Sequence, residues 1–207
     1  MMDIITFNSH IAKGIFTESR FYAKHPKWPY LDYEKRGRSL YSGNNSFVEC
    51  GYSFPHNITS VYWITGKISY KHLLVGHTAI SYDFMGCYMA KIKIDGFWYI
   101  FHIHSSNGDS SDCKRTWLDF KERYRQRITE IHEFRPIKPN DGYYSILLNN
   151  KIERNLSSTS NKSKIMDLSG CGIITADNSF YSAIIDRNSH LIYDGKLRKM
   201  DPCPVHE

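Results

Sequence analysis

One dipeptide constrains the fold more than any other feature of the chain. Asp95-Gly96 separates two stretches rich in β-branched and aromatic residues, CYMAKIKI before it and FWYIFHIHS after it. An Asp-Gly pair in this setting predicts a two-residue type I′ turn and therefore an antiparallel hairpin. Pairing then starts with Ile94 opposite Phe97 and runs outward along both strands.

The hairpin register assigns each side chain to a face, because successive residues of a strand point to opposite sides. Counting outward places Met89 opposite His102 and Cys87 opposite His104. The first face is wholly apolar or aromatic and is predicted to be the core: Tyr88, Ala90, Ile92, Ile94, Phe97, Tyr99, Phe101 and Ile103. The second face is predicted to stay open: Cys87, Met89, Lys91, Lys93, Trp98, Ile100, His102 and His104.

The predicted open face brings a thiol and an imidazole together. Opposite residues of an antiparallel pair have Cβ atoms about 5 Å apart, so Cys87 and His104 are within reach of each other. A thiolate beside an imidazole is a nucleophile at neutral pH. His102 lies diagonal to Cys87 and is a second candidate base, and Gly86 allows a ligand to approach the backbone. The alternative is a buried structural cysteine beside a histidine with all its hydrogen bonds made.

The rest of the chain predicts an α+β fold that is mostly β. Short strand-like stretches follow one another from Ser60 to Ser105, and further strands are expected at 143–148 and 166–196. Residues 111–131 are predicted to form one main helix, with Trp117, Phe120 and Tyr124 on one face and Ser111 or Asp112 as its cap. We expect an antiparallel β-sandwich core with this helix packed on it. The polar stretch 155–164 is expected to be a loop.

Length and composition predict one globular domain over residues 1–207. Residues 1–59 are interpreted as an irregular N-terminal elaboration and residues 60–207 as a β-rich catalytic core. The five cysteines form no C-x-x-C pair and are expected to be free thiols of a reducing compartment. No run of about 18 apolar residues predicts a membrane span, and the N-terminus lacks a Sec signal pattern. We therefore expect a cytoplasmic protein, or one translocated into a target cell's cytosol without a cleaved signal.

The motif content bears on partners and cofactors. The net charge is +6, but the one dense basic run, residues 121–127, comes with no nucleic-acid-binding motif. No Gly-rich phosphate loop or cofactor motif is present. We expect no cofactor, no metal, no nucleic-acid partner and a monomeric protein.

Three residues around the hairpin resemble a known family. Ser81 stands six residues before Cys87, and His104 stands seventeen after it. This spacing resembles the glutamine deamidase superfamily, and within it the chemoreceptor deamidase CheD most closely; other members are the catalytic domain of cytotoxic necrotising factor and the Burkholderia lethal factor. The resemblance covers about 25 residues, Ser81 to Ser105. The position of Ser81 usually carries threonine in that family, which is a departure.

The resemblance implies a reaction and a partner. Cys87 would attack the carboxamide of a glutamine on a folded protein, His104 would activate the thiol and protonate the ammonia, and Ser81 would orient the imidazole. Backbone N–H groups near Gly86 and Cys87 would hold the oxyanion. The substrate would be a protein with a surface glutamine, a host protein if the chain is a secreted toxin or effector.

A second cysteine competes for the same role. LSGC at Leu168 to Cys171 matches the cysteine motif of the toxin members, and DLSGC resembles DFMGC at Asp83 to Cys87, which is compatible with an internal duplication or with chance. A three-residue turn at 177–179 would place Ile185, not a histidine, opposite Cys171. Because the chemistry requires a base beside the thiol, the hairpin geometry favours Cys87.

Other functions stay open from the sequence. One is a non-enzymatic binding module or inactive relative that docks a partner on its β surface. Another is a cysteine protease or acyl transferase, although those place the histidine far downstream of the cysteine. A metal site would draw on His102, His104 and Cys113, with Asp109 or Asp112 as a further ligand.

Overall fold

The computed structural model describes residues 46–54, 57–105, 111–156, 166–186 and 191–206. Two helices lie in these ranges, α4 at Ser111–Arg123 and α5 at Gly142–Leu156. The strands are β1 Phe47–Glu49, β2 Gly51–Phe54, β3 Ile58–Val61, β4 Ile68–Leu73, β5 Thr78–Ser81, β6 Tyr88–Ile94, β7 Phe97–Ile103, β8 Ile128–Phe134, β9 Leu168–Ile174, β10 Phe180–Asp186, β11 Leu191–Ile192 and β12 Arg198–Met200. The fold is α+β and mostly strand, as the sequence predicts.

The predicted hairpin is confirmed. Asp95 and Gly96 both have positive φ, 50° and 84°, as a type I′ turn requires. Ile94 pairs with Phe97, and the ladder continues without a shift to Tyr88 opposite Ile103. Cys87 and His104 are the next residues outward, so they lie just beyond the last ladder pair.

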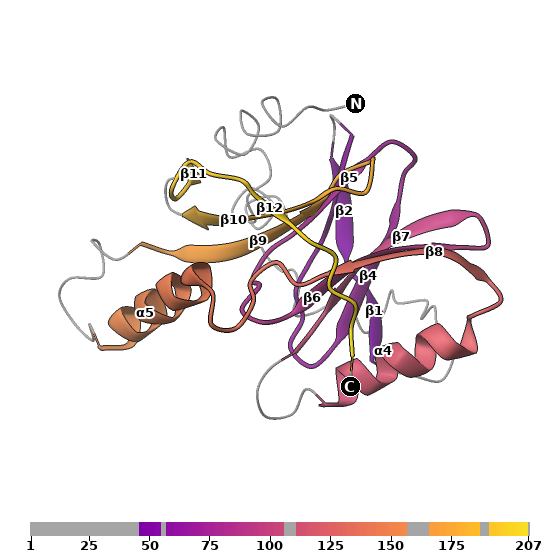
Figure 1. Ribbon diagram of the computed structural model, residues 1–207, viewed down its shortest axis with the longest axis horizontal. Coiled ribbons are helices and arrows are strands. Elements are labelled where there is room, and N and C mark those ends of the chain that lie inside the picture. Colours follow the sequence, from indigo (N-terminus) through magenta and orange to yellow (C-terminus); the bar gives the residue numbers. More distant parts are fainter. Residues whose placement is uncertain (1–45, 55–56, 106–110, 157–165, 187–190, 207) are drawn as a thin grey trace.

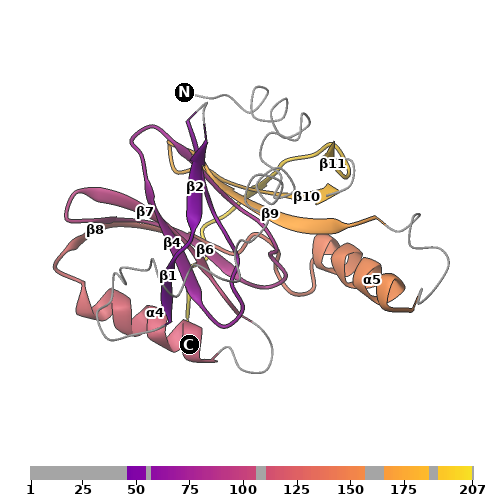
Figure 2. The same cartoon turned by 180° about the vertical axis from the view of Figure 1, so that it is seen from behind.

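The strands form two sheets of mixed direction (Figures 1 and 2). The first sheet has the order β1-β4-β7-β6-β8, and the second has the order β11-β10-β9-β5-β3-β2 with β12 beside β10. The expectation of purely antiparallel sheets is wrong for two pairs, because β1 is parallel to β4 and β3 is parallel to β5. Turn signals in the sequence do not distinguish these crossover connections from hairpins.

The first sheet is buried on both faces, which corrects the expectation of one open face. Its predicted core face packs on Trp117 and Phe120 of α4, which are fully buried. Its other face shares a cluster with the second sheet, in which Met89 and Ile100 meet Ile174 and residues of β3, β5 and β10. The layers are therefore helix α4, first sheet and second sheet. At the hairpin tip the predicted core face reaches the surface, where Phe97 is 59 % exposed.

The helices differ from the sequence prediction in two places. Helix α4 ends at Arg123, and residues 128–131 belong to strand β8 rather than to the predicted helix. The predicted strand at 143–148 is the first half of helix α5, so the expectation of a single main helix is wrong. The burial of Tyr143 and Leu147, four residues apart, is the helical signal that the aromatic and β-branched letters masked.

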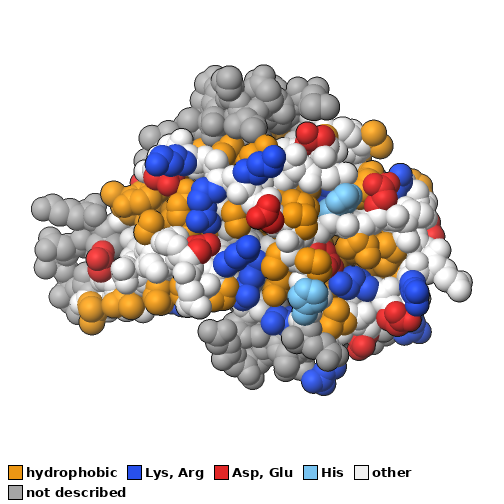
Figure 3. All heavy atoms as spheres, viewed as in Figure 1, with side chains coloured by type: hydrophobic (Ala, Val, Ile, Leu, Met, Phe, Trp, Pro, Cys, Tyr) orange, Lys and Arg blue, Asp and Glu red, His pale blue; other side chains and the backbone are white. Residues whose placement is uncertain are grey.

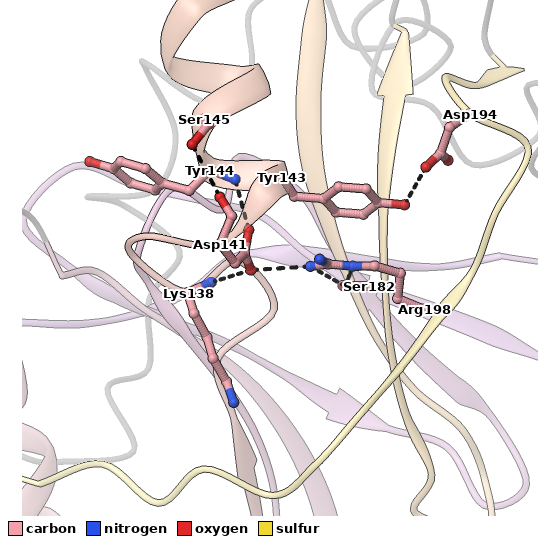
Figure 4. A network of polar contacts seen from close by, with 8 residues as sticks. All are labelled: Lys138, Asp141, Tyr143, Tyr144, Ser145, Ser182, Asp194 and Arg198. Carbon is pink, nitrogen blue, oxygen red and sulfur yellow. Dashed lines mark hydrogen bonds and ion pairs between the residues drawn. The ribbon is translucent and has the colours of Figure 1, made fainter.

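Helix α5 is held at its start by a polar network (Figure 4). Asp141 caps it by accepting a hydrogen bond from the Tyr144 backbone N–H at 2.8 Å. Arg198 of β12 reaches Asp141 at 3.2 Å, donates to Ser182, and stacks on the Tyr143 ring at 3.6 Å. The network ties α5 to the second sheet, which explains why a helix that projects from the body starts where it does.

The far half of α5 carries exposed apolar side chains. Leu148 and Ile152 are about two-fifths exposed, and Leu156 is 77 % exposed. Apolar side chains form a row along the lower edge of this lobe in Figure 3. Residues 157–164 of the predicted loop lie outside the described residues, whereas Asn155 and Leu156 close the helix.

The β-rich part begins earlier than expected, because β1, β2 and the start of β3 lie between residues 47 and 59. These strands pair in both sheets, so residues 47–54 and 57–59 belong to the β-rich core and not to an irregular elaboration. Residues 1–45 lie outside the described ranges. In the part of the chain that the structure describes, no helix has the length and apolar character to cross a membrane.

Candidate functional site

Cys87 lies at the start of β6, directly after a turn that breaks from β5. Asp83 and Gly86 have positive φ, 63° and 105°, so the chain reverses sharply just before the cysteine. The thiol Sγ accepts a hydrogen bond from the Ser105 backbone N–H at 3.4 Å. Cys87 is 4 % exposed and packs with Phe84 and Met89 in the cluster between the sheets.

Burial keeps the Cys87 thiol protonated. Desolvation raises its pKa from 9.0 to about 11, because the thiolate would lose its hydration. Backbone N–H groups of Ser105 and Met85 and the positive charge of Arg135 act in the opposite direction but do not overcome burial. The resting site therefore holds a neutral thiol, and not the preformed thiolate that the sequence predicted.

His102 is fixed in one tautomer by Ser81. The Ser81 hydroxyl donates its single hydrogen to the Val61 carbonyl at 2.6 Å. Its oxygen lies 2.8 Å from His102 Nδ1 and must accept there, so Nδ1 carries the ring proton. His102 Nε2 consequently holds a lone pair, and it is buried with no hydrogen-bond partner among the described residues.

The environment of His102 disfavours its charged form. Burial lowers its pKa well below the usual value, and the neighbouring His104 lowers it further. The Phe84 ring stacks on the imidazole at 4.1 Å with an interplanar angle of 6°, which fixes the ring plane. His102 is thus a neutral, rigid imidazole with a free lone pair on the same strand face as Cys87.

His104 has the opposite tautomer. Its Nδ1 accepts a hydrogen bond from the Gly66 backbone N–H at 3.2 Å, so the proton of the neutral ring sits on Nε2. Burial lowers its pKa, and Trp63 lies beside it at a centroid distance of 5.8 Å. With Nδ1 occupied and Nε2 protonated, His104 can donate a hydrogen bond but has no free lone pair.

The three predicted site residues therefore assemble differently from the expectation. Ser81 orients His102, two residues before the predicted partner His104. Among the described residues, neither imidazole hydrogen-bonds to the Cys87 thiol, whose partner is the Ser105 N–H. The predicted register places both histidines on the same strand face as Cys87, but Ser81 hydrogen-bonds His102 and not the His104 that the spacing of six and seventeen residues indicates.

Cys171 lies in the middle of β9 rather than at a strand end. It is fully buried and pairs with Ala183, two residues from the Ile185 that the sequence suggested. Its neighbours are apolar residues of the second sheet, such as Ile58 and Ile80, in a cluster separate from the one that contains Cys87. The described residues place no histidine opposite this cysteine, whereas His190 lies outside them.

The two similar pentapeptides lie side by side. The Phe84 N–H donates to the Gly170 carbonyl at 3.1 Å, and Ser169 Oγ bonds both the backbone N–H and the carboxylate of Asp83. A Cβ on Gly170 would lie 2.3 Å from the Phe84 carbonyl oxygen. LSGC thus supports the turn before Cys87. Its serine hydrogen-bonds Asp83, and its glycine leaves room for the Phe84 backbone.

Arg135 is a site residue that the sequence analysis missed. It follows β8, and its Nε donates to the Gly86 carbonyl at 2.7 Å. Its guanidinium lies 5.0 Å from the centre of the Tyr88 ring, one residue beyond Cys87. No local pattern marks this arginine, because it reaches the site only when β8 pairs with β6.

The proposed metal ligands do not gather in the described part of the chain. No group of three or more His, Cys, Asp or Glu side chains there could hold an ion. Asp109 and the side chain of Asp112 lie outside the described residues. All five cysteines are free, and Cys203 is the one that is half-buried.

The chain matches no protein-family model, no curated protein and no solved structure. Its function is therefore argued from its own residues.

Proposed function

We propose that the chain is a thiol amidohydrolase, in particular a protein-glutamine deamidase, with Cys87 as nucleophile and His102 as base. The observation that carries the proposal is the buried, unpartnered lone pair of His102 Nε2. Ser81 holds the tautomer that exposes this lone pair, and the hairpin puts it on the same face as Cys87. Leaving a buried nitrogen unpaired costs stability, which is the kind of cost that a reacting group carries.

The reaction would proceed from a neutral pair. As Cys87 Sγ bonds to the carboxamide carbon, the thiol proton passes to His102 Nε2, and the carbonyl π electrons move to oxygen. Collapse of this intermediate breaks the C–N bond, and ammonia leaves with the proton from His102. Water then attacks the thioester, which leaves glutamate and restores the thiol. The raised pKa of Cys87 requires that proton transfer accompany attack, because no thiolate is present beforehand.

Four groups would assist this chemistry. The Ser105 and Met85 N–H groups and the Arg135 charge favour the thiolate, so they stabilise sulfur as its proton leaves. His104 carries a proton on Nε2 and would donate a hydrogen bond from it to the developing oxyanion. Cys87 is 4 % exposed, so the proposal requires that the side chain of a protein glutamine reach a nearly buried thiol.

The two mixed sheets that share one core suit a β-sandwich, the architecture that the deamidase resemblance implies. We extend the proposal to a monomeric effector acting on a protein in a target cell's cytosol, where its five free thiols would persist.

The raised thiol pKa favours a second candidate, a binding module without catalysis. In that case Cys87 is a packing residue, and its exchange for serine changes little. The variants Cys87→Ser and His102→Gln distinguish the deamidase from the binding module.

The test is conversion of glutamine to glutamate in a mixture of glutamine-containing proteins, followed by peptide mass spectrometry and ammonia release. We expect the wild-type chain to convert a glutamine, and both Cys87→Ser and His102→Gln to lose about a thousandfold in rate. His104→Gln is the matched control and should lose only about tenfold. Conversion that survives in Cys87→Ser, or wild-type binding of a protein without any conversion, would overturn the enzymatic proposal.

A further inference from the structure

Two cations face the ring of Tyr88, the residue that follows Cys87 in the chain. The Arg135 guanidinium lies 5.0 Å and the Lys114 ammonium 5.8 Å from the centre of the Tyr88 ring. Tyr88 is the residue after Cys87, and Arg135 also binds the carbonyl of Gly86, the residue before it. The positive charge is therefore built around the backbone that carries the thiol.

These two cations differ from seven other basic side chains of the described ranges in the absence of an acidic neighbour. Neither Arg135 nor Lys114 has a carboxylate partner among the described residues. A carboxylate lies within 4.0 Å of seven other basic side chains there: Lys71, Lys93, Lys121, Arg125, Arg127, Arg154 and Arg198. Two like charges around one ring without a counterion repel each other, so an anion bound between them would be stabilised.

The geometry of Arg135 suits a carboxylate in particular. Its Nε is used by Gly86, which fixes the side chain and leaves the N–H donors of both terminal nitrogens. Those donors form a planar fork that matches the two oxygens of a carboxylate. Gly86 keeps the approach open, because a Cβ there would already lie 3.2 Å from an Arg135 terminal nitrogen.

We propose that Arg135 and Lys114 form a carboxylate subsite beside Cys87, so that the site selects a glutamine next to an acidic residue of the substrate chain. The inference rests on the proposed function, which requires a glutamine in the substrate. The acidic residue of the substrate is inferred from the two cations. Free glutamine also carries a carboxamide near a carboxylate. The test therefore distinguishes a peptide substrate from free glutamine.

The test uses two synthetic peptides with one central glutamine, flanked by aspartate in one and by isosteric asparagine in the other. Binding is measured by fluorescence anisotropy on the full chain carrying Cys87→Ser, and conversion is measured on the wild-type chain. We expect the aspartate peptide to bind about tenfold more tightly than the asparagine peptide, with the advantage lost at high salt. Free glutamine should not compete with the peptide; competition at similar concentration would identify a small-molecule site instead.

Variants on one helix supply the matched control. Lys114→Gln should weaken binding of the aspartate peptide about threefold, and Arg135→Gln about tenfold. Lys114→Gln should leave binding of the asparagine peptide unchanged. Arg115→Gln removes the same charge from the adjacent, exposed position of α4 and should have no effect. An equal effect of Arg115→Gln, or equal affinity for both peptides, would overturn the subsite.

The two proposals fail in different ways. Selective binding of the aspartate peptide without conversion would support the subsite and refute the deamidase. Equal conversion of both peptides would support the deamidase and refute the subsite. If neither peptide binds, the subsite is refuted.

Discussion

Two stretches of this chain share the pattern Asp-x-x-Gly-Cys, and they fold in opposite ways. In 83–87 the glycine and the aspartate take positive φ, and the cysteine ends a sharp turn just before strand β6. In 167–171 the stretch runs into strand β9, and Cys171 sits at its centre without exposure. The glycine opens a turn in the first and admits a neighbouring backbone in the second.

The difference teaches that similar letters can have complementary roles. The 167–171 stretch binds the turn of the 83–87 stretch through Ser169 and the Gly170 carbonyl. A cysteine at a strand end can face a substrate, whereas a cysteine within a central strand packs. Four predictions test this comparison, and they follow from the largest expected effect to the smallest.

Substituting the glycines should destabilise the supporting stretch more than the turn. Gly170→Ala places a Cβ 2.3 Å from the Phe84 backbone oxygen, and we expect a loss of about 3 kcal/mol or more in the free energy of unfolding. Gly86→Ala places a Cβ 3.2 Å from the end of the Arg135 side chain and 3.6 Å from the Ser105 carbonyl oxygen, and it must hold φ near 105°, at a cost of about 2 kcal/mol. Urea denaturation measures both. A smaller loss for Gly170→Ala would break the claim that β9 supports the turn.

Removing the Ser81 hydroxyl should affect the Cys87 site and leave Cys171 unchanged. In the wild-type chain, ¹⁵N NMR of the histidine rings should find the proton of His102 on Nδ1 and that of His104 on Nε2. Ser81→Ala should release His102 into a mixture of tautomers and lower any conversion rate about tenfold. Ser182→Ala, in β10 of the same sheet, is the control. A single shared tautomer for both histidines in the wild-type chain would contradict the assigned roles.

The two cysteines should differ in their reaction with iodoacetamide. Half-buried Cys203 should be labelled first, and labelling of Cys87 should rise with pH up to about 11, because burial raises its pKa. Cys171 should react only when the chain unfolds. Peptide mass spectrometry follows each site, and labelling of Cys171 ahead of Cys87 in the folded chain would reverse the comparison.

The smallest expected effect is on the pH dependence of stability and concerns Lys91. This residue lies in β6, which follows the 83–87 stretch, and contacts the residues after β9, which contains most of the 167–171 stretch. Its ammonium donates to the Thr175 and Ala176 carbonyls just after β9, and burial lowers its pKa from 10.5 to about 8. Between these values the unfolded chain binds more protons, so stability should rise with pH. Lys91→Met should flatten this rise, whereas Lys93→Met on the same strand should keep it. Thermal unfolding across this pH range measures the slope, and an unchanged slope in Lys91→Met would refute the assignment.

Some of the fold could be predicted from the sequence because its signals are local. Asp95-Gly96 determined the turn and hence the register that places Cys87, His102 and His104 on one face. Trp117 and Phe120 marked the buried side of α4 by helical spacing. The prediction of a strand at 143–148 was wrong. It relied on the aromatic and β-branched residues there and not on the four-residue spacing of Tyr143 and Leu147, which is typical of a helix, here capped by Asp141.

By itself, then, the sequence determined the hairpin, the mostly β content and the face on which the candidate site lies, since turn chemistry and side-chain alternation act between neighbouring residues. Only the tertiary structure decided that this face is buried by a second sheet and that Ser81 pairs with His102. It also brought Arg135 to Gly86 from β8, 49 residues further along the chain. These contacts join distant segments, and tautomers and pKa values follow from the partners and burial that such contacts create.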